Sequence, residues 1–301
     1  MNNTPCKLSL GPVPYYWPAQ KLWDFYTQAA GWPLDIVCLG ETVCAKRRAL
    51  TPREWLAIAD MLAAAGKEVV LSTLALVEAE SELGAMRRLC ANARYPVEAN
   101  DMAAVHMLSE QGVEFVTGPG LNIYNPRTLA VLAGLGLRRW VPPVELSGES
   151  IASLHRARPP GVQTELFAYG RMPLAWSARC FTARAHGLGK DDCGFRCLDD
   201  PDGRLVRTRD GEPFVVLNGI MTQSARTLCL LGELPAIRDL GIEVLRISPQ
   251  WEYTACVVAA HDRARSGAHS EPAADALDRY MPAGRCHGYW YGSPGMALRA
   301  P

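Results

Sequence analysis

A regular alternation between two kinds of segment limits what this chain can fold into. From residue 7 to about residue 170, short runs rich in β-branched and other apolar residues are separated by Ala- and Leu-rich stretches. In the Ala- and Leu-rich stretches the apolar residues recur at three and four positions, which is typical of amphipathic helices. The strand-like runs are KLSLGPV, DIVCLG, EVVLSTL, YPVEA, VEFVTG, RRWVPPVEL and TELFAYG.

Two of the helical stretches carry clear start signals. Thr51 precedes Pro52, and Asn125 precedes Pro126, so each pair places an N-cap residue directly before proline at the first helical position. Seven β–α units without a Gly-rich dinucleotide fingerprint favour a (β/α)-barrel over a doubly wound sheet. The best-defined predicted helices span residues 52–65, 77–93, 126–135 and 149–156.

The alternation breaks after Gly170. Residues 171–200 hold three cysteines among glycines, prolines and charges, and residues 203–219 predict a β-hairpin that turns at Asp210-Gly211. A strand-like run, IEVLRISP, and a helical stretch near 254–264 then resume the alternation. We therefore predict one α/β domain over residues 1–301: a TIM-like (β/α)-barrel with a cysteine-bearing insertion and a β-hairpin after the seventh strand.

Composition narrows the functional classes. The 301 residues are 49% hydrophobic, which is enough to build a full core. Lys plus Arg and Asp plus Glu number 31 each, so the net basic footprint of a nucleic-acid-binding protein is missing. No signal peptide is recognisable, and no run approaches the roughly 18 apolar residues of a membrane span. We expect a cytoplasmic protein with no transmembrane segment and no nucleic-acid partner.

Three cysteines lie together in the non-periodic segment. Cys193 and Cys197 are separated by three residues, and Cys180 lies thirteen positions before Cys193. Structural thiols normally lie within periodic apolar segments, and a disulfide framework is not expected in a reducing compartment. Metal or cluster binding is therefore the favoured interpretation, with structural thiols as the alternative. One close pair and one single cysteine fit an iron–sulfur cluster better than structural zinc, which prefers two close pairs.

A four-iron cluster needs a fourth cysteine, and Cys44 is the best candidate. It follows the second strand, where a barrel places a loop of its functional face. Its neighbours include Glu41, which we expect beside Cys44, and the basic run 46–48, whose cations would offset a negative cluster. Cys286, in the glycine-rich tail, is the competitor. The other cysteines in apolar strand or helix contexts are predicted to be buried thiols: Cys38, Cys90, Cys229 and Cys256.

Several strings resemble one family over essentially the whole chain. They include SLGPVPYYWP, LGETVCAKRR, PLAWSARCFTAR, DDCGFRC, FVVLNGIMTQS and LRISPQ. These are similar to members of the collagenase-like peptidase family that act in oxygen-independent ubiquinone synthesis. The resemblance implies a 4Fe–4S cluster ligated by Cys44, Cys180, Cys193 and Cys197. It also implies a heterodimer with the homologous protein UbiU, and hydroxylation of the ubiquinone ring without O₂. The substrates would be prenylated precursors, which a lipid-binding protein could present.

Carboxylates near strand ends are the candidates for acid–base chemistry. Glu98, Glu145 and Glu165 lie at or near strand-like runs, and carboxylates there commonly face the active site of a barrel. Glu165 and Glu145 are the favoured catalytic residues. Pairing of these glutamates with arginines in the barrel mouth is the alternative.

The sequence leaves the enzymatic role open between different classes of function. The favoured function is that of an iron–sulfur subunit of a ubiquinone-precursor hydroxylase. The alternatives are a cluster-dependent RNA hydroxylase or peptidase of the same family, and a non-catalytic scaffold that its cluster keeps folded.

Overall fold

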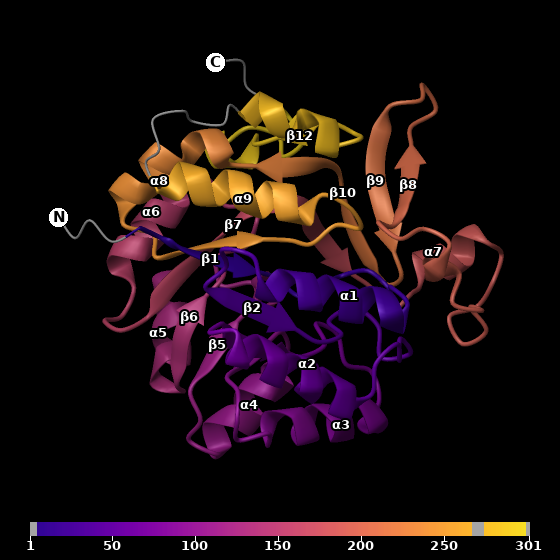
Figure 1. Ribbon diagram of the computed structural model, residues 1–301, viewed down its shortest axis with the longest axis horizontal. Coiled ribbons are helices and arrows are strands. Elements are labelled where there is room, and N and C mark those ends of the chain that lie inside the picture. The colour runs from indigo at the N-terminus through magenta and orange to yellow at the C-terminus, as the bar shows by residue number, and fades with distance from the viewer. Residues whose placement is uncertain (1–4, 267–273, 299–301) are drawn as a thin grey trace.

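A closed parallel barrel is the centre of the molecule (Figure 1). The computed structural model describes residues 5–266 and 274–298. Within these ranges eight parallel strands follow one another around the barrel, and β11 closes it by pairing with both β1 and β7. The TIM-like (β/α)-barrel is therefore confirmed. The barrel strands are β1 (Lys7–Leu10), β2 (Ile36–Leu39), β3 (Glu68–Ser72), β4 (Val97–Ala99), β5 (Phe115–Thr117), β6 (Leu137–Trp140), β7 (Gln163–Trp176) and β11 (Val244–Ile247).

Helices connect the strands and cover the outside of the barrel (Figure 1). None of the helices in the described part of the chain is long and apolar enough to cross a membrane. The α-helices are α1 (Ala19–Ala30), α2 (Pro52–Ala64), α3 (Glu80–Cys90), α4 (Met102–Glu110), α5 (Pro126–Gly134), α6 (Gly148–Ala157), α7 (Phe181–Ala185), α8 (Leu234–Leu240) and α9 (Thr254–Arg265). Short 3₁₀ turns are η1 (Pro119–Leu121), η2 (Arg196–Leu198), η3 (Leu231–Glu233), η4 (Ala274–Tyr280) and η5 (Tyr289–Tyr291).

The predicted helix start signals are confirmed at α2 and α5. Thr51 and Glu54 form a reciprocal capping box at α2, and the side chain of Asn125 accepts the Thr128 N–H over 2.9 Å at α5. The helix predicted over residues 77–93 is shorter than expected. The carboxylate of Glu82 accepts the backbone N–H groups of residues 78 and 79, so the helical turn begins only at residue 80.

The insertion builds a second, antiparallel sheet between β7 and β11. Strand β7 continues past the barrel and pairs with β10 (Met221–Cys229), which pairs in turn with β9 (Pro213–Asn218). The predicted hairpin is present as β8 (Arg204–Arg207) and β9. Strand β10 was not predicted as a strand; a tight turn containing Gly219, with φ +65°, connects it to β9. A two-residue strand, β12 (Arg285–Cys286), lies beside β10.

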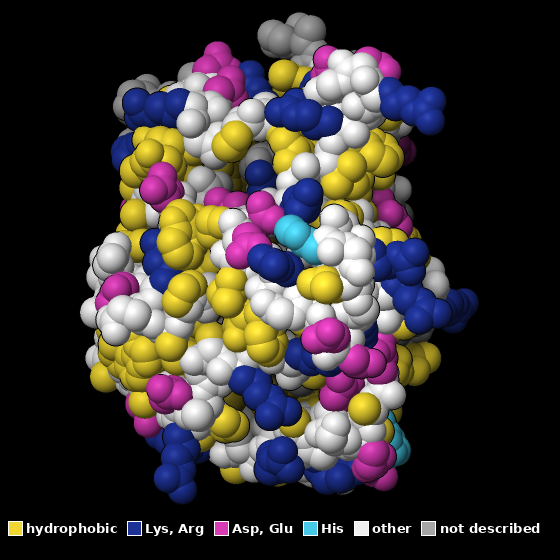
Figure 2. Space-filling model, turned by 90° about the vertical axis from the view of Figure 1, so that its right-hand side faces the viewer, with side chains coloured by type: hydrophobic (Ala, Val, Ile, Leu, Met, Phe, Trp, Pro, Cys, Tyr) yellow, Lys and Arg dark blue, Asp and Glu magenta, His cyan; other side chains and the backbone are white. Residues whose placement is uncertain are grey.

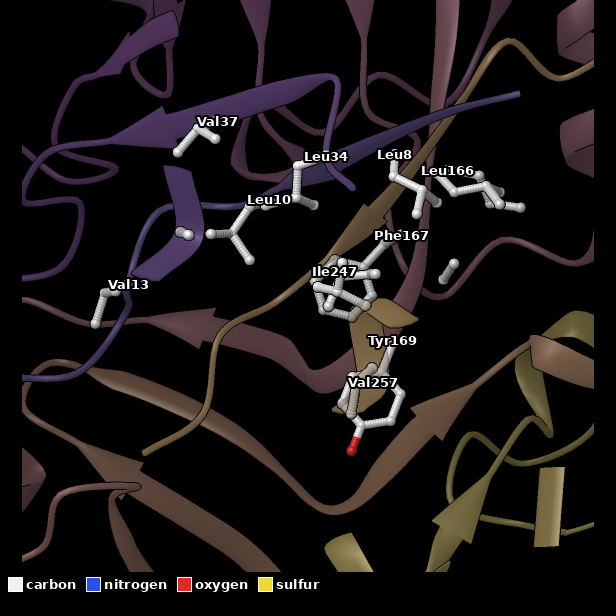
Figure 3. Packing of buried hydrophobic residues seen from close by; sticks show 14 of the residues in the cluster. Leu8, Leu10, Val13, Leu34, Val37, Leu166, Phe167, Tyr169, Ile247 and Val257 are labelled. Atoms are coloured by element: carbon white, nitrogen blue, oxygen red, sulfur yellow. The ribbon is translucent and has the colours of Figure 1, made fainter. Parts of the chain in front are cut away.

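Alternate strand residues face opposite sides of the barrel wall. The outward-facing side chains pack beneath the helices in a large apolar core, which includes Leu8, Leu10, Val37, Leu166 and Ile247 (Figure 3). The inward-facing set has a smaller apolar cluster of Ile36, Cys38, Val70, Val116 and Val244. Charged side chains, which are described below, also occupy the interior, together with small polar ones such as Ser9.

Candidate functional site

The four predicted cluster cysteines lie in one region at the carboxyl end of the barrel. Cys44 follows β2, Cys180 caps α7, Cys193 lies in the next loop, and Cys197 belongs to η2. All four are half-buried. Burial raises the pKa of the Cys44 and Cys197 thiols, and the neighbouring Cys180 raises both further. The hydrogen bond to Asp191 raises the pKa of Lys46 most. Cys193 and Cys44 also lie close enough to raise it by smaller amounts.

The thiols do not form a compact site for a single ion. Within the described residues, no group of three or more His, Cys, Asp or Glu side chains could hold one metal ion. A four-iron cluster is larger than one ion, so its cysteine ligands lie farther apart. A donor set made only of thiols, beside two cations, fits the ligand preference of such a cluster.

Arg47 is the buried cation of this region. Its side chain is 1% exposed, and it donates to the Pro14 carbonyl over 2.8 Å and to Asn218 Oδ1 over 2.7 Å. It also contacts the Cys197 thiol. A Cβ at Gly219 would lie 2.8 Å from Arg47 Nη2, so the β9–β10 turn needs glycine there. Burial alone would lower the pKa of Arg47, but neighbouring acidic groups raise it, so Arg47 remains charged.

Glu41 shapes the loop that carries Cys44. Its Oε1 accepts the backbone N–H groups of Val43 over 2.8 Å and of Cys44 over 3.0 Å, and it lies 3.7 Å from Arg47 Nη1. Burial raises the pKa of Glu41, and Arg47 opposes that effect. The carboxylate is thus beside Cys44 and holds the loop in a tight turn.

Two ion pairs fasten the cysteine-bearing insertion to the barrel loops. Lys46 Nζ donates to the Lys190 carbonyl over 3.0 Å and to Asp191 Oδ1 over 2.5 Å. Lys190 pairs with Glu78 in the loop after β3. Sequence reasoning missed these contacts. The only signal was the run of charges immediately before Cys193, which looks the same when it is solvated.

The remaining cysteines lie mostly in packed positions. Cys38 and Cys90 are 0% and 2% exposed, as predicted, and Cys286 is buried in β12 near Cys229. Cys229 is 2% exposed, as predicted, although it ends a strand, β10, where the apolar sequence had suggested a helix. One expectation was wrong. Cys256 is exposed, because the buried face of α9 is formed by other residues of that helix.

A chain of alternating charges crosses the barrel interior, and Glu165 is at its centre. Glu165 is fully buried; Arg139 Nε and Arg246 Nε each donate to one of its oxygens over 2.7 Å. Arg139 also pairs with Glu68 at 2.8 Å, and Arg246 also pairs with Glu98. Burial alone would raise the pKa of Glu165, but the two arginines hold it down at about 2. This geometry corresponds to the ion-pairing alternative, because both oxygens of Glu165 are paired with arginines inside the barrel.

Glu98 is the last carboxylate in this series of ion pairs and lies near the barrel mouth. It is 1% exposed, and its Oε1 accepts a hydrogen bond from Asn100 Nδ2 over 3.1 Å. The same amide donates to the Thr73 carbonyl over 3.0 Å. A Cβ at Gly118 would lie 1.9 Å from Asn100 Oδ1, so a glycine is required beside this group.

Glu145, the other catalytic candidate, is exposed in the loop after β6. It accepts a hydrogen bond from the Tyr124 hydroxyl. Burial and the nearby Glu145 raise the pKa of Tyr124 to about 12. Of the two candidates, Glu145 is therefore the one that solvent and substrate can reach. Asn122 has φ +54° and is a turn residue next to η1.

The chain belongs to peptidase family U32, whose family model matches residues 24–298. Solved structures with a similar chain path include the U32 peptidase Mk0906, at 11% identity, a TM-score of 0.47 and coverage of 83% of this chain and 95% of that one. Dihydropteroate synthase from Thermus thermophilus has 13% identity and a TM-score of 0.42, with 90% and 96% coverage. A tryptophan synthase complex from Pyrococcus furiosus has 10% identity and a TM-score of 0.42, with 91% and 95% coverage.

Proposed function

We propose that this chain is a UbiV-type iron–sulfur subunit that serves oxygen-independent hydroxylation of the ubiquinone ring. In this proposal Cys44, Cys180, Cys193 and Cys197 hold a 4Fe–4S cluster. The chain acts in the cytoplasm as a heterodimer with a UbiU-like homologue. Its substrates are prenylated ubiquinone precursors.

The gathering of the four thiols in one region, with Arg47 beside Cys44 and Cys197, is the observation that supports this proposal most. Two parts of the chain that are far apart in the sequence contribute the thiols: the loop after β2, and the insertion with the start of α7 and the loop through η2. A cluster with four thiolate ligands is net negative, and a buried guanidinium beside it lowers the cost of burying that charge. When bound, such a cluster supplies one-electron transfer. Glu41 holds the Cys44 loop, and the Lys46–Asp191 pair holds the loop of Cys193.

Exposed apolar side chains on the insertion and hairpin support the partner in the proposal. Phe214 is 51% exposed, and β8 is an edge strand that pairs only with β9 among the described strands. On the face that carries the insertion, hydrophobic groups lie between charged ones (Figure 2). An unpaired strand edge and exposed apolar side chains beside it are features that a protein partner can bind. The exposed set is Phe181, Phe195, Leu198, Leu205 and Phe214.

The decisive experiment is anaerobic co-purification with the UbiU-like homologue, followed by iron, sulfide and zinc analysis. We expect about four iron and four sulfide per chain. Deletion of the gene should lower ubiquinone only in cells grown without oxygen. Stoichiometric zinc without sulfide, or an equal loss of ubiquinone in air, would contradict the proposal.

The peptidase alternative has its own test. Peptide cleavage that persists when all four cysteines are replaced with serine would favour it over the hydroxylation role.

A further inference from the structure

A cavity of about 160 Å³ lies beside Gly170 of β7 and Ser248, the residue that follows β11. It is on the same end of the barrel as the Cys44 loop, because all barrel strands are parallel. The carboxyl end of the strands is where TIM barrels place their active sites. A Cβ at Gly170 would lie 2.4 Å from Ser248 Cβ, so glycine is what allows the two strands to meet there.

The size of the cavity suits one six-membered ring. A cavity of roughly 150 Å³ in an apolar protein core accommodates benzene. Sites for drug-sized ligands are larger, about 300–1,000 Å³. The 160 Å³ here therefore admits one ring, and any long substituent must remain outside.

Aromatic side chains form one wall of the cavity. The rings of Tyr253 and Tyr280 are stacked, with centroids 4.7 Å apart and planes 23° from parallel. Trp251 lines the cavity next to them. Tyr253 is 52% exposed, so this wall borders the solvent. Aromatic walls favour a flat aromatic ring, which stacks or meets them edge to face.

The polar part of the wall offers a hydrogen-bond acceptor. Asp202 Oδ1 accepts the backbone N–H of Trp251 over 2.8 Å, whereas its Oδ2 accepts no hydrogen bond from the described residues. Arg171 donates from Nη1 to the Asp202 carbonyl, and its Nε is buried without a hydrogen-bond partner among the described residues. A hydroxyl group both donates and accepts, so it can meet an acceptor and a donor in the same wall. The two arginines of the lining, Arg171 and Arg279, balance two acids, Asp202 and Glu252. This balance favours a neutral ligand with a hydroxyl donor over an anion or a cation.

The cavity is also next to the cysteine region. Tyr15 lines it, and the adjacent Pro14 carbonyl accepts a hydrogen bond from Arg47 Nη1 over 2.8 Å. Arg47 contacts the Cys197 thiol on its other side. A single buried side chain thus connects the wall of the cavity to the cysteines.

We propose that this cavity binds a single phenolic ring, with its hydroxyl donating to Asp202 and its face against Tyr253. The choice of a phenol among hydroxylated six-membered rings rests on the proposed function, since ubiquinone precursors carry such a ring.

The test is calorimetric titration of the anaerobically purified full chain with three probes. Phenol has the flat ring and the donor, anisole lacks the donor, and glucose lacks the flat ring. We expect saturable binding of phenol, at least tenfold weaker binding of anisole, and no binding of glucose. Asp202→Asn should weaken phenol binding at least tenfold. Tyr253→Asn, at an exposed position with φ +64° that asparagine tolerates, should weaken it several-fold. Asp199→Asn, on an exposed acid of the same insertion, is the matched control and should change nothing.

Circular dichroism and iron content of each variant exclude misfolding as the cause of a loss. No saturable phenol binding, or equal binding by wild type and both cavity variants, would overturn the proposal. Preferential binding of glucose would assign the cavity to a carbohydrate instead. These readouts are independent of ubiquinone synthesis. If phenol binds but deletion leaves anaerobic ubiquinone intact, the proposed function fails and the ring site stands. If phenol does not bind but deletion lowers anaerobic ubiquinone, the proposed function stands and the substrate ring binds elsewhere.

Discussion

Arg246 donates from Nε to Glu165 Oε1 over 2.7 Å in the middle of the barrel. A second nitrogen of the same side chain, Nη2, pairs with Glu98, so one guanidinium connects two buried carboxylates. Barrel interiors are usually filled by branched apolar side chains. Here the interior charges instead form ion pairs with one another, and removal of one partner leaves a buried, unpaired charge that destabilises the fold.

Replacement of Glu165 with glutamine should therefore destabilise the fold strongly. Glutamine keeps the shape but leaves Arg139 and Arg246 short of one negative charge, and breaking a buried pair in this way costs about 3–5 kcal/mol. Urea denaturation of the anaerobically purified protein at neutral pH measures the loss. Glu114→Gln is the control, because Glu114 forms an exposed pair with Arg138, and its replacement should change the free energy of unfolding little. Equal effects of the two variants would contradict this account.

The pH dependence of stability follows from the ion pairs of Glu165 with Arg139 and Arg246. The pKa of Glu165 is about 2 in the folded chain, below its ordinary value of 4.5. A lowered pKa stabilises the fold above pH 4.5, and this contribution is lost as the pH falls from 4.5 toward 2. The stability difference between wild type and Glu165→Gln should thus shrink over that range. A constant difference down to acid pH would show that the carboxylate charge is not responsible.

The barrel could be predicted because its signals are local. Apolar periodicity, and capping residues such as Thr51 and Asn125, act within one helix or strand. Pairing of the glutamates with arginines was the alternative that the sequence offered, but the partners could not be identified, because Arg139 and Glu165 are 26 residues apart and Arg246 is 81 residues beyond Glu165. In the sequence Arg139 follows another arginine, Arg138, and Arg246 is a single charge within an apolar run. Only closure of the barrel shows which carboxylate it meets.

For the cysteines too, some features could be predicted from the sequence and others depend on the folded structure. Spacing and lack of periodicity selected Cys180, Cys193 and Cys197 as a group. Nothing in the sequence predicted that Arg47 is buried while its neighbour Arg48 is exposed, since that depends on the turn containing Gly219. The exposure of Cys256 also depends on which face of α9 packs against the barrel.

Serine replacement of each proposed ligand should deplete the cluster. We expect Cys44→Ser, Cys180→Ser, Cys193→Ser and Cys197→Ser each to lower iron and sulfide by more than half, because a cubane needs four thiolates. Iron analysis of anaerobically purified variants checks this. Cys90→Ser and Cys286→Ala are controls and should keep the metal. Loss of iron in Cys286→Ala with retention in Cys44→Ser would move the fourth ligand to the tail.

Charge exchange tests how the insertion is held. Lys46→Asp or Asp191→Lys alone should break their pair and expose the cysteine-bearing loop to protease several-fold faster, because local opening becomes more frequent. The double variant restores opposite charges and should recover most of the resistance. Limited proteolysis, with cleavage sites mapped by mass spectrometry, measures the rates. High salt should reduce the difference in proteolysis rate between the wild type and the single variants, since salt screens the attraction between exposed charges. A double variant as labile as the singles would exclude this pair as the fastening contact.

The last prediction separates a catalyst from a scaffold, and it concerns Glu145. Its carboxylate is exposed at the functional end of the barrel and accepts a hydrogen bond from the Tyr124 hydroxyl. Glu145→Gln keeps the size of the side chain and removes the charge, so the fold and the iron content should be unchanged. If Glu145 transfers a proton, anaerobic ubiquinone formation should fall by about 10²–10⁴-fold.

Two further measurements make the Glu145 result interpretable. The pKa of Tyr124, about 12 in the wild type, should move down in Glu145→Gln, which shows that the contact was present. Tyr124→Phe removes the hydroxyl but keeps the carboxylate, so it separates the role of the charge from that of the hydrogen bond. Normal quinone synthesis in both variants, with the pKa of Tyr124 shifted as expected, would place proton transfer in the partner. This subunit would then hold the cluster without transferring the proton.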